Sequence, residues 1–282
     1  MKKIFLLPNV ITAFGLSCGL FVIFRMNMAA VGQVTQELLS IISGILLLAA
    51  LADLLDGAVA RIMKAESAFG SIFDSLSDAI TFGVAPSVII LKSLSLEHES
   101  KMSFLITAAA IIFSVCGILR LARFCVLSQQ SKEDEVFADS FKKNFTGLPI
   151  PAAAAAVVSM NLLLASKEMQ SVSTIAKDYR AEILFLTLLL IGYFMISRWK
   201  FPSLKSLHIK VTSFRVVFLT VMVSVALFYG LLYHFVFVFF GFSWLYLAIA
   251  WVLSLVRIIS GKKITTLEDF EPEPESELED DS

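Results

Sequence analysis

Long apolar segments, separated by short polar stretches, run through most of the chain. A window of about 19 residues finds eight segments long enough to cross a hydrocarbon layer of ~30 Å. These predicted spans cover residues 8–27, 39–62, 68–91, 103–124, 147–165, 181–197, 214–234 and 238–257. The last two are separated only by a predicted tight turn near Gly241. The pattern therefore predicts an all-α polytopic membrane protein, a bundle of about eight transmembrane helices.

The composition agrees with this fold class. Of the 282 residues, 57% are hydrophobic and 25 are phenylalanine, and the mean hydropathy is +0.83. Soluble domains do not reach these values, whereas polytopic membrane proteins do. The chain begins Met-Lys-Lys and continues into an apolar run, but no small-residue cleavage site ends a short apolar core there. We therefore expect a retained first helix and not a signal peptide.

The distribution of charge predicts the orientation in the membrane. Nine acidic residues and no basic ones lie between 268 and 282, so residues 1–267 carry 23 basic against 15 acidic side chains. Placing the N-terminus in the cytoplasm puts 17 of the 23 lysines and arginines on that side, as the positive-inside rule requires. Eight spans then leave both termini in the cytoplasm. We expect a multi-pass protein of the cell (inner) membrane, with residues 260–282 as a disordered acidic tail.

Four aspartates interrupt the second and third apolar segments, and an arginine lies between them. They are Asp53, Asp56, Asp74 and Asp78, with Arg61 after the second of them. An ionisable side chain at membrane depth costs a few kcal/mol or more, so each marks a functional-site hypothesis. Four carboxylates within 26 residues repel one another. We therefore expect a bound cation between them.

Helical spacing places these carboxylates on two faces. Asp53 and Asp56 lie about 60° apart on one helix, while Gly70, Asp74 and Asp78 follow one another at i, i+4 and i+8 on the next. Two antiparallel helices facing each other could gather all four carboxylates around one point. Oxygen ligands alone suit Mg²⁺ or Mn²⁺, and two such ions could stabilise the attacking and leaving oxygens of a phosphoryl transfer.

Other residues near the carboxylates fit a phosphorylated ligand. Gly57 removes side-chain volume where a diphosphate would approach the backbone, and Arg61 could bind a phosphate oxygen with its planar guanidinium. Asn9 and Thr12 share a helix face at i, i+3 and could bind a nucleotide. An ordinary helix start, to which Pro8 is suited, would also explain them.

The arrangement of residues 53–78 resembles a known family. The order is Asp, two residues, Asp-Gly, two residues, Ala-Arg, eight residues, Gly, three residues, Asp, three residues, Asp, and it matches the signature of the CDP-alcohol phosphotransferases at every position. These membrane enzymes use a divalent metal to move a phosphate-bearing group from a CDP-linked donor to an alcohol, often releasing CMP, and homodimers are common among them. The resemblance implies Asp53, Asp56 and Asp74 as metal ligands, Asp78 as general base within reach of the metal, and Gly57, Arg61 and Gly70 as the CDP site.

Further stretches resemble the serine-using branch of this family, the bacterial membrane-embedded phosphatidylserine synthases. They are residues 7–12, 78–86, 120–124, 147–153 and 197–203. The resemblance covers about the first 210 residues and implies a six-helix enzymatic core in 1–211, extended by a transmembrane hairpin in 212–259. It implies transfer of a phosphatidyl group from CDP-diacylglycerol to L-serine, giving phosphatidylserine and CMP, with membrane lipids and no nucleic acid as partners.

The zwitterionic serine would need a cation for its carboxylate. Four basic residues at predicted cytoplasmic helix ends could supply it, namely Arg120, Arg123, Arg198 and Lys200, of which we favour Arg123 and Arg198 because each lies in a serine-branch stretch. Positive-inside anchoring of the helices would explain each of them as well.

Several other functions remain compatible with parts of the pattern. A sister enzyme could use glycerol 3-phosphate or inositol phosphate, whose phosphate dianion should demand a denser cationic pocket. An intramembrane prenyltransferase also uses aspartates and Mg²⁺, but without the Gly and Ala-Arg of this chain. A transporter could relay protons or bind Na⁺ through the carboxylates, but the helix-breaking Gly/Pro pairs expected near the midplane of two related halves are missing from the sequence. A purely structural polar cluster between helices could explain two carboxylates, but it hardly explains four carboxylates together with an arginine.

Overall fold

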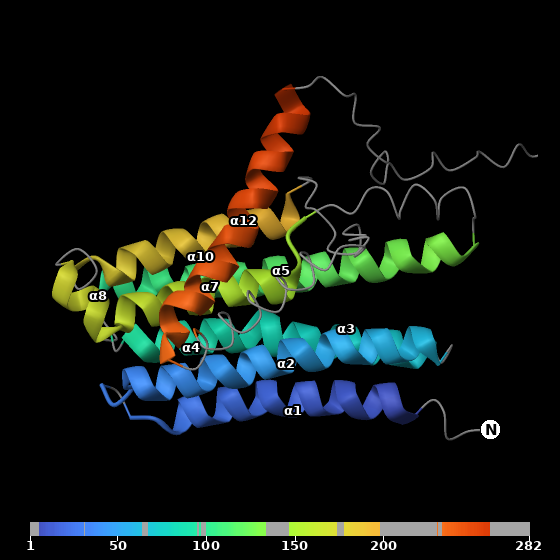
Figure 1. The fold of residues 1–282 in the computed structure, drawn as a ribbon, viewed down its shortest axis with the longest axis horizontal. Helices are drawn as coiled ribbons and strands as arrows, with labels where there is room; N and C mark the ends of the chain where they lie inside the picture. Colours follow the sequence, from blue (N-terminus) through green and yellow to red (C-terminus); the bar gives the residue numbers. More distant parts are fainter. Residues whose placement is uncertain are drawn as a thin grey trace, which may run out of the picture.

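The computed structural model describes residues 6–30, 32–63, 67–94, 96, 100–133, 147–173, 178–197, 230 and 233–259. Regular structure in this part of the chain is entirely helical, which confirms the predicted all-α class (Figure 1). The helices are α1 (Leu6–Met28), α2 (Gln36–Ile62), α3 (Ala68–Asp78), the π-helix η1 (Ala79–Val84), α4 (Ala85–Leu94), α5 (Lys101–Glu133), α7 (Ile150–Ala165), α8 (Lys167–Val172), α10 (Arg180–Ile196) and α12 (Phe235–Ile259).

Helix lengths support the predicted membrane class. Five helical stretches are long and apolar enough to cross a membrane, namely Leu7–Met28, Gln36–Ile62, Phe69–Leu94, Lys101–Val126 and Phe235–Val252. The third of these is continuous through α3, η1 and α4. α7 is a shorter apolar helix of 16 residues. The predicted span 214–234 and the tail 260–282 lie almost wholly or wholly outside the described residues.

Two predicted boundaries are wrong. Gly241 lies inside α12, so no turn separates two spans there. The rings of Phe235 and Phe239 stack at i, i+4 with centroids 5.5 Å apart, and the apolar helix outweighs the cost of about 1 kcal/mol for one glycine. The polar stretch 128–146, which the sequence predicts as a loop after the fourth span, is helical as far as Glu133, where α5 ends. Its last turns contain neither Gly nor Pro that would end the helix.

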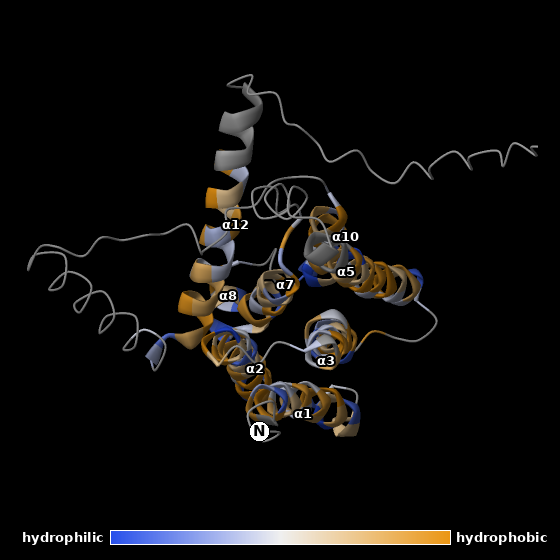
Figure 2. Ribbon diagram, turned by 90° about the vertical axis from the view of Figure 1, so that its right-hand side faces the viewer, coloured by the Kyte–Doolittle hydropathy of each residue, from blue (hydrophilic) through white to orange (hydrophobic). Residues whose placement is uncertain are grey.

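The long helices other than α12 run side by side, with α7 between α2 and the α5–α10 pair (Figures 1 and 2). α1 packs along α2 and also contacts α3, η1 and α4, whereas α12 crosses α7 at a steep angle. The core between the helices is made of small and branched side chains, such as Ala153, Val157 and Leu188, which are fully buried. Large apolar side chains face outward on the same helices, among them Phe24, Leu54 and Phe104, as a lipid-facing surface requires.

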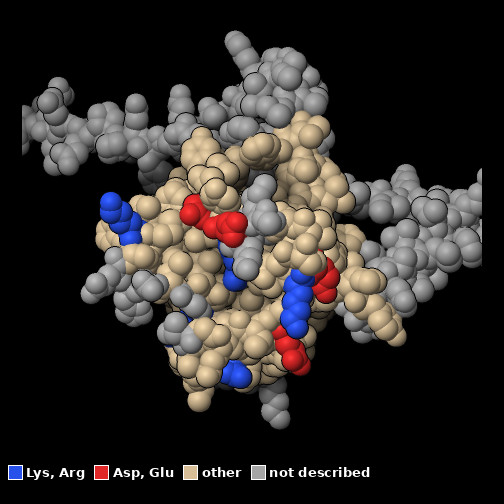
Figure 3. Space-filling view, turned by 90° about the vertical axis from the view of Figure 1, so that its left-hand side faces the viewer, with Lys and Arg blue, Asp and Glu red and all other residues tan. Residues whose placement is uncertain are grey.

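Charged side chains gather at the ends of the helices. The end of the molecule at α8 shows lysine, arginine, aspartate and glutamate side chains over an otherwise uncharged surface (Figure 3). Residues of both signs at this end include Arg25 in the last turn of α1, Glu37 in the first turn of α2 and Glu168 in α8. Neither sign dominates there, unlike the excess of basic residues predicted for the opposite end.

Candidate active site

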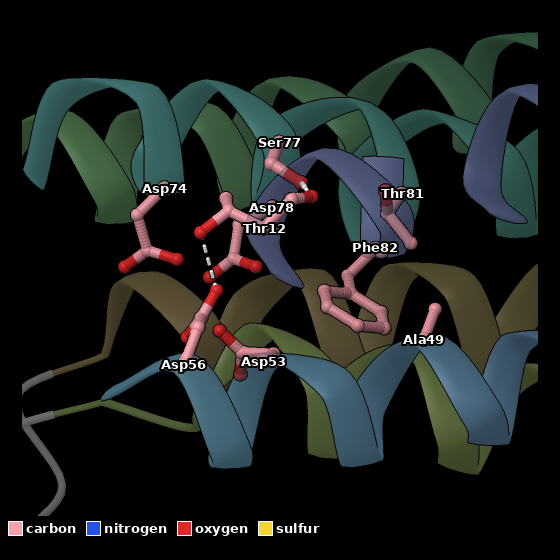
Figure 4. Close-up of a pocket in the computed structure, with 10 residues that line it drawn as sticks. Thr12, Ala49, Asp53, Asp56, Asp74, Ser77, Asp78, Thr81 and Phe82 are labelled. Atoms are coloured by element: carbon pink, nitrogen blue, oxygen red, sulfur yellow. Dashed lines mark hydrogen bonds between the residues drawn. The ribbon is translucent and has the colours of Figure 1, made fainter. Parts of the chain in front are cut away.

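The structure brings the four aspartates together between α2 and α3. Asp53 and Asp56 come from α2, Asp74 and Asp78 from α3, and their carboxyl groups point toward one another across one cavity (Figure 4). One carboxylate oxygen each from Asp53, Asp56 and Asp74 can be chosen so that all three lie within 4.8 Å of one another. The facing helices expected from the i, i+3 and i, i+4 spacing are therefore present in the fold.

Capping residues begin both helices that carry the carboxylates. Thr35 caps α2 by accepting a hydrogen bond from Leu38 N at 3.2 Å, and Ser67 caps α3 by accepting one from Gly70 N at 3.0 Å. Such caps satisfy backbone donors that a helix start leaves open. The cap at Ser67 sets where α3 begins, and Asp74 and Asp78 then follow Gly70 along one face.

Gly70 lies where α1 approaches α3. A Cβ at this position would lie 3.0 Å from Ser67 Oγ and 3.1 Å from Oδ1 of Asn9, so a larger residue would press on both. Asn9 and Gly70, predicted separately as CDP-binding residues, are thus neighbours. Gly57 has open space around it, since a Cβ there would meet nothing within 4 Å, and Arg61 is exposed near the end of α2.

Thr12 of α1 binds a site carboxylate directly. Its hydroxyl donates to Asp56 Oδ2 at 2.5 Å and lies 3.1 Å from the carbonyl oxygen of Pro8. Ser77 Oγ in turn donates to the carbonyl oxygen of Thr12 at 3.5 Å. Asp56 and Thr12 are only 4% and 6% exposed, so this bond holds a buried carboxylate in one orientation. Thr12 was predicted to contact a nucleotide, and that role stays a prediction. The structure adds a second role, the hydrogen bond that orients the Asp56 carboxylate.

The charge of the cluster calls for a cation. The side chains of Asp53 and Asp74 lie within hydrogen-bond reach of each other, and Asp56 adds a third carboxyl group nearby. Two like charges 4 Å apart repel by about 4 kcal/mol at an effective dielectric constant of 20. A donor set made only of carboxylate oxygens matches the ligands of Mg²⁺ and Mn²⁺. The residues present therefore fit a divalent metal.

One basic residue of α5, Arg120, lies on the Asp78 side of the cluster. The guanidinium of Arg120 is close enough to Asp78 to interact with it electrostatically, and it also interacts with Tyr246 of α12. Arg123 follows three residues later on α5 and is half-buried. Of the four predicted serine-binding residues, Arg198 and Lys200 lie outside the described residues.

The cavity contains residues that sequence reasoning did not single out. The residues that line it are Thr12, Gly15, Ala49, Asp53, Asp56, Asp74, Ser77, Asp78, Thr81 and Phe82. Gly15 of α1 faces Ala49 of α2, and a Cβ at Gly15 would make an ordinary contact with the carbonyl oxygen of Ala49 at 3.7 Å. Ser77 directly precedes Asp78 and Thr81 follows it by three residues. A hydroxyl so near an intramembrane carboxylate in the sequence was the signal that could have identified both residues.

Comparison with known proteins gives concordant matches. The profile of the family described as CDP-alcohol phosphatidyltransferase matches residues 5–193, which include all four aspartates. A CDP-diacylglycerol–serine O-phosphatidyltransferase of Helicobacter pylori is 32% identical over 263 residues, covering 93% of this chain and 98% of the relative. Proteins with the same description from Bacillus subtilis and Methanocaldococcus jannaschii are 30% identical over 199 residues and 37% over 151 residues. The former match covers 71% of this chain and 91% of the relative, the latter 54% and 58%.

Proposed function

The chain belongs to the CDP-alcohol phosphatidyltransferase family, and from this premise we propose that it transfers the phosphatidyl group of CDP-diacylglycerol to the hydroxyl of L-serine. The products are phosphatidylserine and CMP. The observation that carries the proposal is the convergence of four aspartates from α2 and α3 on one cavity. The choice of serine as acceptor is supported by relatives described as CDP-diacylglycerol–serine O-phosphatidyltransferases, two of which match over more than 90% of their length.

Asp53, Asp56 and Asp74 would hold the divalent metal, Mg²⁺ or Mn²⁺, with Asp78 at the edge of the same site. When bound, the metal supplies positive charge that balances the diphosphate of the donor and the CMP that leaves. Thr12 keeps Asp56 oriented through its 2.5 Å bond, so that this carboxylate does not have to be ordered when the metal arrives.

Asp78 would act as the general base. It accepts the proton of the serine hydroxyl while the serine oxygen forms a bond to the phosphorus that carries diacylglycerol. The bond from that phosphorus to the bridging oxygen of the diphosphate breaks, and CMP leaves with the bonding electrons. Arg120 lies beside Asp78 and could bind the serine carboxylate, together with Arg123, Arg198 or Lys200.

The donor nucleotide would lie toward the start of α1 and α3. Asn9 and Gly70 are adjacent there, and the open space at Gly57 and the exposed Arg61 leave room for a diphosphate. The acyl chains would remain in lipid, because the outward faces of α1, α2 and α3 carry apolar residues such as Phe14, Leu55 and Phe69. We propose that this end faces the cytoplasm, as the predicted distribution of basic residues favours.

The test is a transfer assay with purified protein. CDP-diacylglycerol, Mn²⁺ or Mg²⁺ and labelled L-serine are incubated with the wild type and with Asp78→Asn, and both CMP and lipid label are followed. We expect label to enter lipid with the wild type alone and to stop on chelation of the metal. CMP release with glycerol 3-phosphate or inositol phosphate, but not with serine, would keep the family and reject the acceptor. No transfer to any alcohol would reject the enzyme function.

A further inference from the structure

Two serines join α5 to the continuous α3–η1–α4 stretch that carries Asp78. Ser114 of α5 donates a hydrogen bond to the carbonyl oxygen of Gly83 in η1 at 2.9 Å. Ser87 of α4 donates to the carbonyl oxygen of Ala110 in α5 at 3.0 Å, and the two serine hydroxyl oxygens lie 2.8 Å apart. Serine hydroxyls within helices commonly bond back to their own backbone. These two instead connect neighbouring helices, and Ser87 and Gly83 are buried.

The π-helix η1 occurs at one defined place in this stretch. Pro86 has no N–H, and in a regular α-helix its ring would collide with the carbonyl group four residues earlier. η1 widens the helix directly before this proline, where the N–H of Ala85 donates to the carbonyl oxygen of Ile80, five residues earlier. Such a turn interrupts the regular ladder, and a side chain from outside can bond the backbone there. Ser114 does so at Gly83, so its hydrogen bond marks a single position along the stretch.

The contacts between α5 and the α3–η1–α4 stretch follow one antiparallel register, because residue numbers fall on one side as they rise on the other. In order along α5, the pairs are Ala110 with Ser87, Ser114 with Gly83, Arg120 with Asp78, and Cys125 with Ser75. Arg120 lies six residues beyond Ser114, about 9 Å along α5. The bond made by Ser114 and the approach of Arg120 to Asp78 therefore belong to the same alignment of two helices.

We propose that Ser114 is a positioning residue for the acceptor site: its bond to Gly83 fixes the register of α5, and so holds the guanidinium of Arg120 beside Asp78, where the serine carboxylate would bind. The kinetic part of this inference rests on the proposed function. Apolar contacts between helices are non-directional, whereas a hydrogen bond has a preferred geometry. A slip of α5 by one residue would move Arg120 by about 1.5 Å, and a misplacement of about 1 Å in a positioned group can cost a hundredfold in rate.

The kinetic test compares four variants in the transfer assay. Ser114→Ala removes the hydroxyl, Ser114→Thr keeps it, and Ser87→Ala removes only the neighbouring hydroxyl. Ser159→Ala is the matched control, because Ser159 is buried on α7 and donates to the carbonyl oxygen of Ala156 in its own helix at 3.1 Å.

We expect Ser114→Ala to raise KM for serine about tenfold, with kcat and KM for CDP-diacylglycerol changed less than about threefold. Ser114→Thr should stay within about threefold of the wild type in all three constants, Ser87→Ala should raise KM for serine by a smaller factor, and Ser159→Ala should change nothing. If Ser114→Ala does not fold, Ser114→Cys, which keeps the size but is a weak donor, carries the same prediction. An unchanged KM for serine in a folded variant overturns the inference, as does an equal rise of KM for both substrates.

Disulfide formation measures the register without any activity. The Sγ of Cys125 lies 3.1 Å from the Oγ of Ser75, so Ser75→Cys would bring a second sulfur next to it. A disulfide requires a close and specific geometry, so the rate at which copper phenanthroline oxidises this pair, followed by peptide mass spectrometry, reports how α5 is aligned with α3. Adding Ser114→Ala should slow the oxidation about fivefold or more, and adding Ser159→Ala should not. A rate that Ser114→Ala leaves unchanged overturns the register.

The two readouts separate the inference from the proposed function. A wild type that transfers to another alcohol rejects serine as acceptor, and KM is then compared for that alcohol. A wild type that transfers to no alcohol rejects the proposed function and the kinetic role of Ser114, while the oxidation rate still decides whether Ser114 sets the register. An active wild type whose KM for serine is unaffected by Ser114→Ala rejects the role of Ser114 alone.

Discussion

Replacing Gly19 by alanine should separate α1 from η1. A Cβ at this position would lie 2.9 Å from Cα and Cβ of Thr81 and closer still to its hydroxyl oxygen, and real Cβ atoms essentially never approach within 3.0 Å. Because one of the opposing atoms belongs to the backbone, no side-chain rotation relieves the contact. Overpacking of this kind costs typically about 1–3 kcal/mol, while the better helix propensity of alanine returns up to about 1 kcal/mol.

We therefore expect Gly19→Ala to lose about 1–2 kcal/mol of stability, a fall in apparent Tm of a few degrees. Gly44→Ala in α2 is the matched control, because a Cβ there would meet nothing within 4 Å and only the gain in helix propensity remains. The assay is thermal unfolding of both purified variants in the same detergent, followed by transfer activity. Activity of Gly19→Ala should also fall, since η1 begins directly after Asp78. A Gly19→Ala protein as stable and active as Gly44→Ala would refute the close packing of α1 on η1.

Three further predictions concern the site and the attachment of α12. Asp74→Asn should lower kcat at least a hundredfold and raise the Mn²⁺ concentration needed for half-maximal activity, measured by titrating metal into chelator-treated protein. Thr12→Val removes the bond to buried Asp56, worth about 1.5–3 kcal/mol, and should weaken metal activation about tenfold or more; unaltered metal dependence would contradict the role given to Thr12. Trp244→Phe removes the 3.3 Å bond from Nε1 to the carbonyl oxygen of Ala156, which joins α12 to α7. It should lower the apparent Tm by a few degrees at most and leave kcat unchanged, as expected of a contact outside the cavity.

Much of the fold could be predicted from local pattern. Apolar length predicted the spans that include α1, α2 and the continuous α3–η1–α4 stretch, because a membrane helix must satisfy its own backbone and face lipid along its length. The same pattern misplaced the turn at Gly241 and the end of α5. A glycine and a polar stretch only weaken a helix, and the neighbouring residues decide whether it continues.

The aspartates were predictable as a group because helical periodicity places Asp53 with Asp56 and Asp74 with Asp78 on shared faces. The residues of other helices that contact these aspartates were not predictable from the sequence. Nothing local indicates that Thr12 bonds Asp56, 44 residues away, or that Arg120 of α5 comes to lie beside Asp78.

The sequence by itself determined the helices, their apolar faces and the spacing of the carboxylates, since each of these follows from a few neighbouring residues and the geometry of the α-helix. Only the tertiary structure decided which helices pack against each other and which residues lie opposite one another along their axes. Gly19 therefore faces Thr81, and Asn9 faces Gly70, through the combined packing of α1 on α2, α3 and η1. The rotation and sliding of one helix against another depend on many side chains at once, so no single position in the sequence reveals them.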